Sequence, residues 1–263
     1  MLPVYEAYEF IEVLKGGRTK PWLVLVRVQG IPIPFVVKLF TEEEIERDQK
    51  VTKEVLGSVL AREFDLPTPE AALIRISSSL IEQIRDQEPY FQLAQRDHKI
   101  MFGCAYLEKE YLSTASFSIE SLDKYDGIDS IFAFDCLIKN FDRGIYKPNV
   151  ILHENEFYLI DHESSLKIGI RDIQNFKSGQ VNKIFQNHLF LGYLSAKSQD
   201  QLFDLFVEYL RMLNLAELDS YLSQLQQHKH PVGNIALPKQ YLSMVKQDIP
   251  RFIRILYKLV SHA

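Results

Sequence analysis

The first third of the chain carries its apolar residues in short runs, as β-strands do. Residues 22–28 form an apolar, β-branched run, residues 29–30 supply a turn, and residues 35–40 return as a second strand. Further strands are expected at residues 71–76 and 99–107. This region is therefore expected to be rich in strands.

Helical spacing of apolar residues dominates from about residue 118 onward. The expected buried helical faces lie at residues 131–138, 202–213, 215–225 and 252–260. A hairpin at residues 150–160 interrupts this helical region. The pattern predicts an α+β fold with a strand-rich N-lobe at residues 1–105 and a helical C-lobe at residues 106–263, and a cleft between two such lobes is a natural ligand site.

A helix is also expected inside the strand-rich part. Thr41 and Glu44 have the spacing of a capping box, and Pro67 ends the helix that they open. Glu54 lies at the flank of its apolar face, and Lys38 lies in the preceding apolar strand. A lysine in such a strand either faces solvent or has a partner, and Glu54 is either an ordinary surface residue or that partner.

Glycines mark two further positions. Gly16 and Gly17 precede the first expected hairpin, where they form either a simple turn or a loop whose backbone N–H groups bind phosphate oxygens. Gly103 interrupts an apolar strand, and glycine there permits either a bend or the close approach of a ligand.

Composition narrows the classes of partner. The 263 residues are 46% hydrophobic, carry a net charge of −5 and contain no block of Lys and Arg, so no direct nucleic-acid partner is expected. No apolar run approaches the ~20 residues of a membrane span, and no secretory signal is expected at the N-terminus. Cys104 and Cys136 are expected to be buried, reduced thiols, which suits a cytoplasmic protein.

Three polar residues lie at the ends of buried elements in the middle of the chain. Asp142 follows the helix at 131–138, Asn149 precedes the hairpin, and Asp161 follows its second strand. Each alone can simply cap a turn. If the hairpin brings them together, the two carboxylates repel each other unless a cation lies between them. Mg²⁺ prefers oxygen ligands, which these carboxylates and the Asn149 amide provide.

These segments resemble the HipA-like kinases, in particular the small stand-alone bacterial branch, and more distantly the phosphatidylinositol 3-/4-kinase and protein-kinase superfamily. The resemblance covers roughly residues 14–190. The segments that carry it are Asn140-Phe141-Asp142-Arg143, Pro148-Asn149-Val150-Ile151-Leu152, Leu159-Ile160-Asp161-His162-Glu163, Pro34 to Lys38, Lys53-Glu54, Leu66 to Glu70 and Phe102 to Leu107.

The resemblance implies a two-lobed protein-kinase-like fold and an ATP- and Mg²⁺-dependent phosphotransferase. Lys38 would contact the ATP phosphates and pair with Glu54. Asp142 would be the catalytic base, with Asn149 and Asp161 as metal ligands. The implied cofactor-binding residues are Gly16, Gly17, Lys38, Phe102, Gly103 and Tyr106, the last three in a hinge beside the adenine.

The substrate implied by the resemblance is a Ser or Thr hydroxyl, either of a protein or of the chain itself, and a regulatory partner would be a separate chain. Two residues depart from the kinase pattern. Lys147 stands five positions after Asp142, where kinases place a metal-binding Asn, and Glu163 stands where relatives often have Gly. These departures leave a second hypothesis open, in which the chain is a catalytically impaired kinase-fold module that binds nucleotide or a partner.

Overall fold

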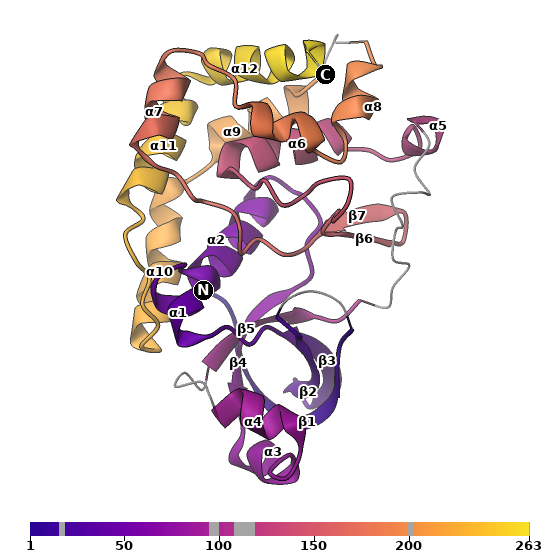
Figure 1. Ribbon diagram of the computed structural model, residues 1–263, viewed down its shortest axis with the longest axis vertical. Helices are drawn as coiled ribbons and strands as arrows, with labels where there is room; N and C mark the ends of the chain where they lie inside the picture. The colour runs from indigo at the N-terminus through magenta and orange to yellow at the C-terminus, as the bar shows by residue number, and fades with distance from the viewer. Residues whose placement is uncertain (16–18, 95–99, 108–118, 199–201, 263) are drawn as a thin grey trace. The chain divides into compact units, whose positions relative to one another are not determined.

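The computed structural model describes residues 1–15, 19–94, 100–107, 119–198 and 202–262. It contains two compact units that interleave along the sequence (Figure 1). Unit 1 comprises Met1–Leu56, Pro69–Glu108 and Glu217–Gly233, and unit 2 comprises Gly57–Thr68, Lys109–Ala216 and Asn234–Ala263. The lobe boundary expected near residue 105 stays a prediction.

Unit 1 is built mainly from strands. Its elements are β1 (Val4–Val13), β2 (Trp22–Val28), β3 (Ile31–Val37), α1 (Glu42–Glu46), the first half of α2 (Lys50–Glu63), β4 (Ala71–Ile76), α3 (Ser78–Gln83), α4 (Glu88–Ala94), β5 (Ile100–Ala105) and α10 (Leu218–Gln227). The strands close into a barrel in the order β1-β2-β3-β5-β4, with β1 and β4 parallel and the other neighbours antiparallel.

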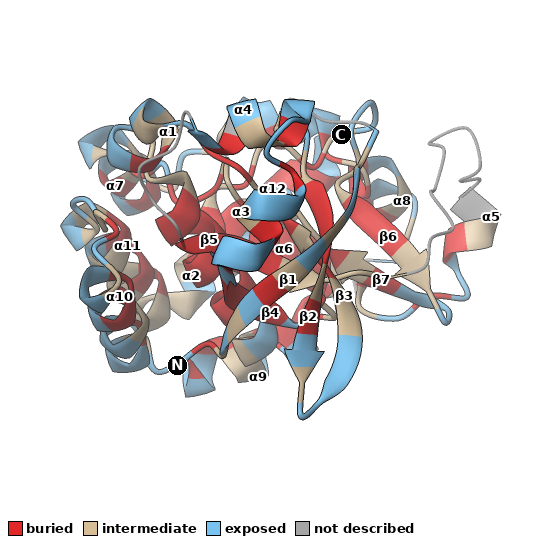
Figure 2. Cartoon of the chain, turned by 90° about the horizontal axis from the view of Figure 1, so that it is seen from below, coloured by how far each residue is buried: buried red, intermediate tan, exposed pale blue. Residues whose placement is uncertain are grey.

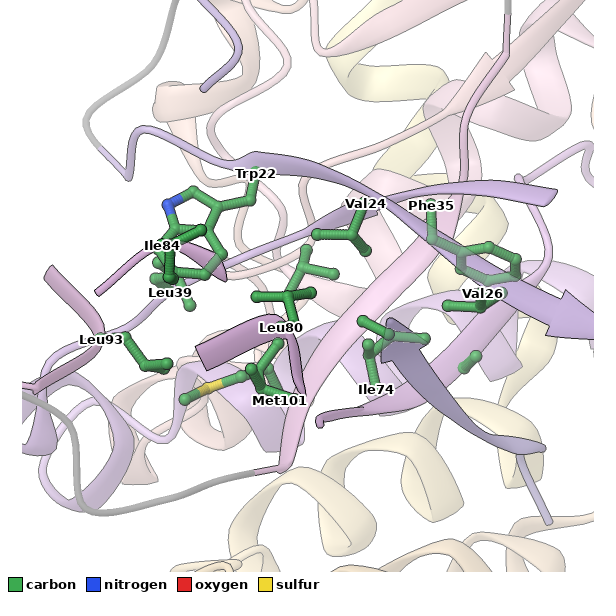
Figure 3. Packing of buried hydrophobic residues seen from close by; sticks show 14 residues of the cluster. Trp22, Val24, Val26, Phe35, Leu39, Ile74, Leu80, Ile84, Leu93 and Met101 are labelled. Carbon is green, nitrogen blue, oxygen red and sulfur yellow. The ribbon is translucent and has the colours of Figure 1, made fainter. Parts of the chain in front are cut away.

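The core of unit 1 lies inside this barrel and under α3 and α4. Trp22, Phe35 and Met101 are fully buried there, together with Leu80 of α3 and Leu93 of α4 (Figure 3). Alternate residues of β2 and β3 point into the core, which is the period of two that the sequence pattern shows. Strand formation here follows from burial of these side chains.

Two local features of unit 1 differ from the sequence expectation. Strand β3 begins at Ile31, ahead of the expected residue 35, because residues 31–34 pair with β2 from Val28 back to Leu25. The capping box of Thr41 and Glu44 is present, but it opens only the short α1. The helix is then interrupted near Gln49, which has a positive φ of 56°, and α2 begins after it.

Unit 2 is mainly helical. Its elements are the second half of α2, α5 (Ile119–Leu122), α6 (Ile128–Ile138), β6 (Val150–His153), β7 (Glu156–Leu159), α7 (Ile170–Lys177), the 3₁₀-helix η2 (Lys183–Asn187), α8 (Leu191–Ser195), α9 (Asp204–Met212), α11 (Ala236–Gln247) and α12 (Ile249–Ser261). A further 3₁₀-helix, η3 (Leu215–Glu217), spans the boundary to α10.

Helix α6 lies at the centre of unit 2. All of its residues except Asp129 are buried (Figure 2). Its Phe134 and Phe206 of α9 both pack against Phe64 at the end of α2, with ring centroids 5.6 and 4.8 Å from the Phe64 ring. A helix buried on every side holds its C-terminal end in a fixed position, and the candidate site begins at that end.

The expected hairpin is confirmed as β6 and β7, which pair antiparallel from Val150 with Leu159 to His153 with Glu156. Its turn residues Glu154 and Asn155 both have positive φ, as a tight hairpin turn requires. Among the described residues, no helix is both long and apolar enough to span a bilayer.

Candidate active site

In unit 1, Lys38 and Glu54 form an ion pair. Lys38 comes directly after β3, and its backbone N–H donates to the Phe102 carbonyl at 3.0 Å. Glu54 projects from α2, and its side chain is only 1% exposed, against 13% for Lys38. A carboxylate this deeply buried is stable only with a charged partner. The contact in the structure is the expected pairing of Lys38 with Glu54.

The hinge residues predicted to border adenine lie on and after β5. The Phe102 side chain is buried. A Cβ on Gly103 would come within 2.6 Å of Ile74, so close packing against β4 already requires glycine there. Tyr106 is partly exposed, while Gly16 and Gly17 lie outside the described residues. The nucleotide-binding roles of these positions stay predictions.

In unit 2, a buried polar network lies at the C-terminal end of α6. The Asp135 carboxylate accepts hydrogen bonds from Arg143 Nε at 2.6 Å, from His188 Nε2 at 3.0 Å and from Asn140 Nδ2 at 3.0 Å. All four side chains are buried. The network ties the helix end and the following loop to the segment near His188, so the loop that carries Asp142 is held from both sides.

The Asp135 carboxyl group of this network is ionised. Burial opposes ionisation of Asp135, but the Arg143 guanidinium and the hydrogen bond from His188 outweigh it and lower the pKa of the carboxyl group. The Phe190 backbone N–H donates to His188 Nδ1 at 3.2 Å. Nδ1 is therefore the acceptor, and the proton lies on Nε2, which donates to Asp135.

Arg143 extends the network to the predicted metal ligand Asn149. Its second guanidinium nitrogen, Nη1, donates to the Asn149 carbonyl, and the Ile160 N–H donates to the same oxygen at 3.2 Å. These contacts hold Asn149 in a left-handed conformation with φ of 47°. Asp161 also has a positive φ, of 62°, so both predicted metal ligands adopt a backbone conformation that is uncommon outside glycine.

The structure brings the three predicted residues of unit 2 together. Asn149 Nδ2 donates to the Asp142 backbone carbonyl at 2.9 Å and to its Oδ2 at 3.3 Å. Lys147 Nζ lies 2.8 Å from Asp142 Oδ2 and 3.1 Å from Asp161 Oδ2. The ammonium thus bridges the two carboxylates. Partial burial opposes its charge, but the hydrogen bonds and charges of Asp142 and Asp161 prevail and raise the pKa of Lys147.

The donor set fits one Mg²⁺ ion. The Asn149 amide nitrogen faces Asp142, which leaves its amide oxygen without a donor among the described residues. That oxygen and the Asp161 carboxylate are hard ligands of the kind Mg²⁺ prefers. A second cation shared by Asp142 and Asp161 would have to displace the Lys147 ammonium, which already contacts Oδ2 of both.

Asp161 is positioned by the tight packing of its neighbour. His162 is buried against Gly57 of α2, where an added Cβ would lie 2.4 and 2.6 Å from His162 Cβ and Cγ. Thr68 fixes the preceding strand, because its hydroxyl donates to the Leu159 carbonyl at 3.1 Å. The turn that carries Asp161 is therefore pressed against α2.

Gly57→Ala is expected to destabilise the protein by roughly 1–2 kcal/mol, because overpacking costs about 1–3 kcal/mol and alanine recovers up to about 1 kcal/mol of helix propensity. The matched control is Gly192→Ala in α8, where an added Cβ meets nothing within 4 Å. Chemical denaturation measures both variants. Equal stability of the two alanine variants would contradict the close contact with His162.

Part of the network was not predicted. Asp135 is an acidic residue in an otherwise apolar helix, and that isolated charge is the signal that identifies it in the sequence. Arg143 is 1% exposed and pairs with the Asp135 carboxylate inside the protein. His188 lies 53 residues from Asp135, and no local pattern indicates their contact.

A similar solved structure indicates the class of fold. The chain is similar to the proinflammatory kinase CtkA of Helicobacter pylori, with a TM-score of 0.51 and 12% identity over 100% of this chain and 98% of that chain. The choline kinase LicA from Streptococcus pneumoniae gives a TM-score of 0.35 and 15% identity over 97% and 95% of the two chains. At 12% identity the CtkA match concerns the fold, and the strand-rich N-terminal part and helical C-terminal part are those of a kinase-like fold.

The sequence match is more specific than the structural one. The HipA-like kinase family matches residues 7–215, which is most of the chain, and the chain belongs to that family. No curated protein sequence matches. Family and fold together support a phosphotransferase in general terms, and they confirm the resemblance predicted from the sequence.

Proposed function

We propose that the chain is an ATP- and Mg²⁺-dependent phosphotransferase that acts on a Ser or Thr hydroxyl, either of a protein substrate or of the chain itself. The observation that carries this proposal is the arrangement in unit 2, where Asn149 and Lys147 hold the Asp142 carboxylate and Lys147 links it to Asp161. A fixed carboxylate beside a metal-ligating pair is what transfer of a phosphoryl group to a hydroxyl requires.

Asp142 is assigned as the catalytic base. Its side chain is 34% exposed, so it is accessible from solvent while its Oδ2 is held by two neighbours. It would orient the acceptor hydroxyl and take its proton as the new P–O bond forms. The proton moves from the hydroxyl oxygen to the carboxylate, and the transferred phosphoryl group leaves ADP behind.

Asn149 and Asp161 are assigned as the ligands of Mg²⁺. The ion would neutralise negative charge on the ATP phosphates. The buried network of Asp135, Arg143 and His188 is assigned a positioning role, because Arg143 binds the Asn149 carbonyl directly. No contact with substrate is assigned to this network.

In unit 1, Lys38 is assigned to the ATP phosphates, with Glu54 fixing its ammonium. Phe102, Gly103 and Tyr106 are assigned to the adenine hinge. The bond from the Lys38 N–H to the Phe102 carbonyl links that hinge to the phosphate-binding lysine. Gly16 and Gly17 are assigned to the phosphate-binding turn.

ATP with Mg²⁺ should raise the melting temperature of the protein. At an ATP concentration about 100 times the Kd, binding adds about 2.7 kcal/mol, and a protein of this size then melts roughly 5 °C or more higher. Tripolyphosphate at the same concentration controls for nonspecific anion binding and should give a smaller shift. Differential scanning fluorimetry makes the comparison.

A double variant tests the part of this shift that depends on unit 1. Lys38→Met combined with Glu54→Gln removes both charges, so no unpaired buried carboxylate remains. It should melt normally without nucleotide and show a much smaller shift with ATP. No shift of the wild-type protein with ATP·Mg²⁺ would contradict nucleotide binding altogether.

A second candidate function is a kinase-fold module that binds nucleotide or a partner without turnover. The Lys147 ammonium favours it, because a positive charge stands where kinases place a metal-binding Asn. The two functions separate cleanly in one comparison. Both predict the ATP-dependent rise in melting temperature, and only the phosphotransferase predicts loss of the γ-phosphate from bound ATP.

A further inference from the structure

The Lys147 side chain contacts both carboxylates of the site. Its Nζ lies 2.8 Å from Asp142 Oδ2 and 3.1 Å from Asp161 Oδ2. The side chain is 49% exposed, and Gly144 pairs with Lys147 in an isolated bridge that fixes the backbone at this point. The bridge fixes the backbone from which the Lys147 side chain reaches the two carboxylates.

Charge explains why a cation belongs at this position. Two carboxylates that share one site repel each other unless a positive charge lies between them. In protein kinases two divalent ions supply that charge, and the Asn five residues after the base holds one of them. Here the residue at that spacing is Lys147, and it brings the positive charge itself.

An ammonium and a divalent ion compete for the same oxygens. Lys147 contacts Oδ2 of Asp142 and Oδ2 of Asp161, so a metal ion bridging these atoms would have to displace it. The Asn149 amide oxygen and the Asp161 carboxylate are oxygen ligands of the kind that Mg²⁺ prefers. The Lys147 ammonium and a metal ion that bridges Asp142 and Asp161 therefore exclude each other at these two oxygens.

We propose that Lys147 is a tethered cation that replaces one of the two divalent ions of a kinase site, so that this chain binds ATP with a single divalent ion and depends less on divalent ions for nucleotide binding. This inference rests on the proposed binding of ATP. It assigns to Lys147 a charge-supplying and specificity-determining role that a surface ion pair does not have.

The variant Lys147→Asn restores the residue type that kinases carry at this spacing. The control is Lys167→Asn, which changes an exposed lysine of unit 2. Wild type and both variants are loaded with a non-hydrolysable ATP analogue and Mn²⁺, and electron paramagnetic resonance counts the bound ions. The affinity for the same analogue is then measured with Mn²⁺ and with excess EDTA.

Wild type and Lys167→Asn should bind about one Mn²⁺ per nucleotide, and Lys147→Asn should bind about two. Removing the metal should weaken nucleotide binding at least about tenfold more in Lys147→Asn than in wild type, because only the variant has lost its permanent cation. This second readout does not depend on catalysis, so an inactive protein still reports it.

Two failures are distinguishable. If wild type binds the analogue but matches Lys147→Asn in both ion count and EDTA sensitivity, the tethered-cation inference is overturned and ATP binding stands. If neither wild type nor Lys167→Asn binds the analogue with Mn²⁺, the proposed function itself is overturned, and the inference falls with it.

Discussion

Asp142→Asn is expected to lower the rate of phosphoryl transfer by about 100- to 10,000-fold, the usual effect of removing a general base. The amide keeps the shape of the side chain but has little basicity, so the acceptor hydroxyl loses the group that takes its proton. Initial rates of ADP formation under saturating ATP and Mg²⁺ measure the effect.

The same substitution should leave folding and ATP binding nearly intact. Asp142 is partly exposed, and its ion pair with the half-exposed Lys147 contributes at most about 1 kcal/mol. Asp126→Asn is the matched control, because it changes an exposed aspartate of unit 2 in the same way. A rate for Asp142→Asn within a few-fold of Asp126→Asn would show that Asp142 is not the base.

Arg143→Met is expected to destabilise the protein by about 3–5 kcal/mol, the typical cost of removing one member of a buried ion pair. Arg143 and Asp135 side chains are both fully buried, with Nε and Oδ2 2.6 Å apart. The variant leaves the Asp135 charge in the protein interior, where His188 and Asn140 are its remaining side-chain donors among the described residues. Urea unfolding measures the loss.

Two further variants separate the charge from lost packing. Arg171→Met changes an exposed arginine on α7 of the same unit and should alter stability by less than about 0.5 kcal/mol. Adding Asp135→Asn to Arg143→Met removes the unpaired charge and should recover part of the stability. If the double variant is no more stable than Arg143→Met, the ion pair is not what stabilises this loop.

The Arg143 network also explains how the site depends on the fold. Arg143 binds Asp135 at the end of α6 and the Asn149 carbonyl before β6. Loss of Arg143 should therefore disturb Asn149, although Arg143 itself has no assigned contact with ATP. Any residual activity of Arg143→Met should need more Mg²⁺ to reach its maximum.

Much of the site could be predicted from the sequence because its contacts are local. Asn149 and Asp161 flank the hairpin, so its geometry brings these two residues together. One short loop joins Asp142 to Asn149. Lys38 and Glu54 are 16 residues apart, directly after β3 and on α2, with only the short α1 between them. Periodicity and turn residues determine such short-range arrangements.

The parts that were missed depend on contacts between distant segments. His188 reaches Asp135 across 53 residues, and Gly57 meets His162 across roughly twice that separation. The break between α1 and α2 occurs at Gln49, a residue that gives no turn signal. Tertiary packing decides these features, and a local pattern carries no information about them.

The departure at Lys147 was visible in the sequence, but its consequence was not. Spacing alone shows a lysine where kinases have a metal-binding Asn. Only the geometry shows that its ammonium contacts Asp142 and Asp161 together. That contact changes the lysine from a defect in the pattern into a source of positive charge within the site.

The most direct test of phosphoryl transfer is a time course with ATP radiolabelled at the γ-phosphate, purified wild-type protein and Mg²⁺, with Asp142→Asn run in parallel. The predicted result is label that accumulates in the protein, in an added Ser/Thr substrate or as released phosphate, at least about 100 times faster for wild type. Equal, background rates for the two proteins would contradict the account.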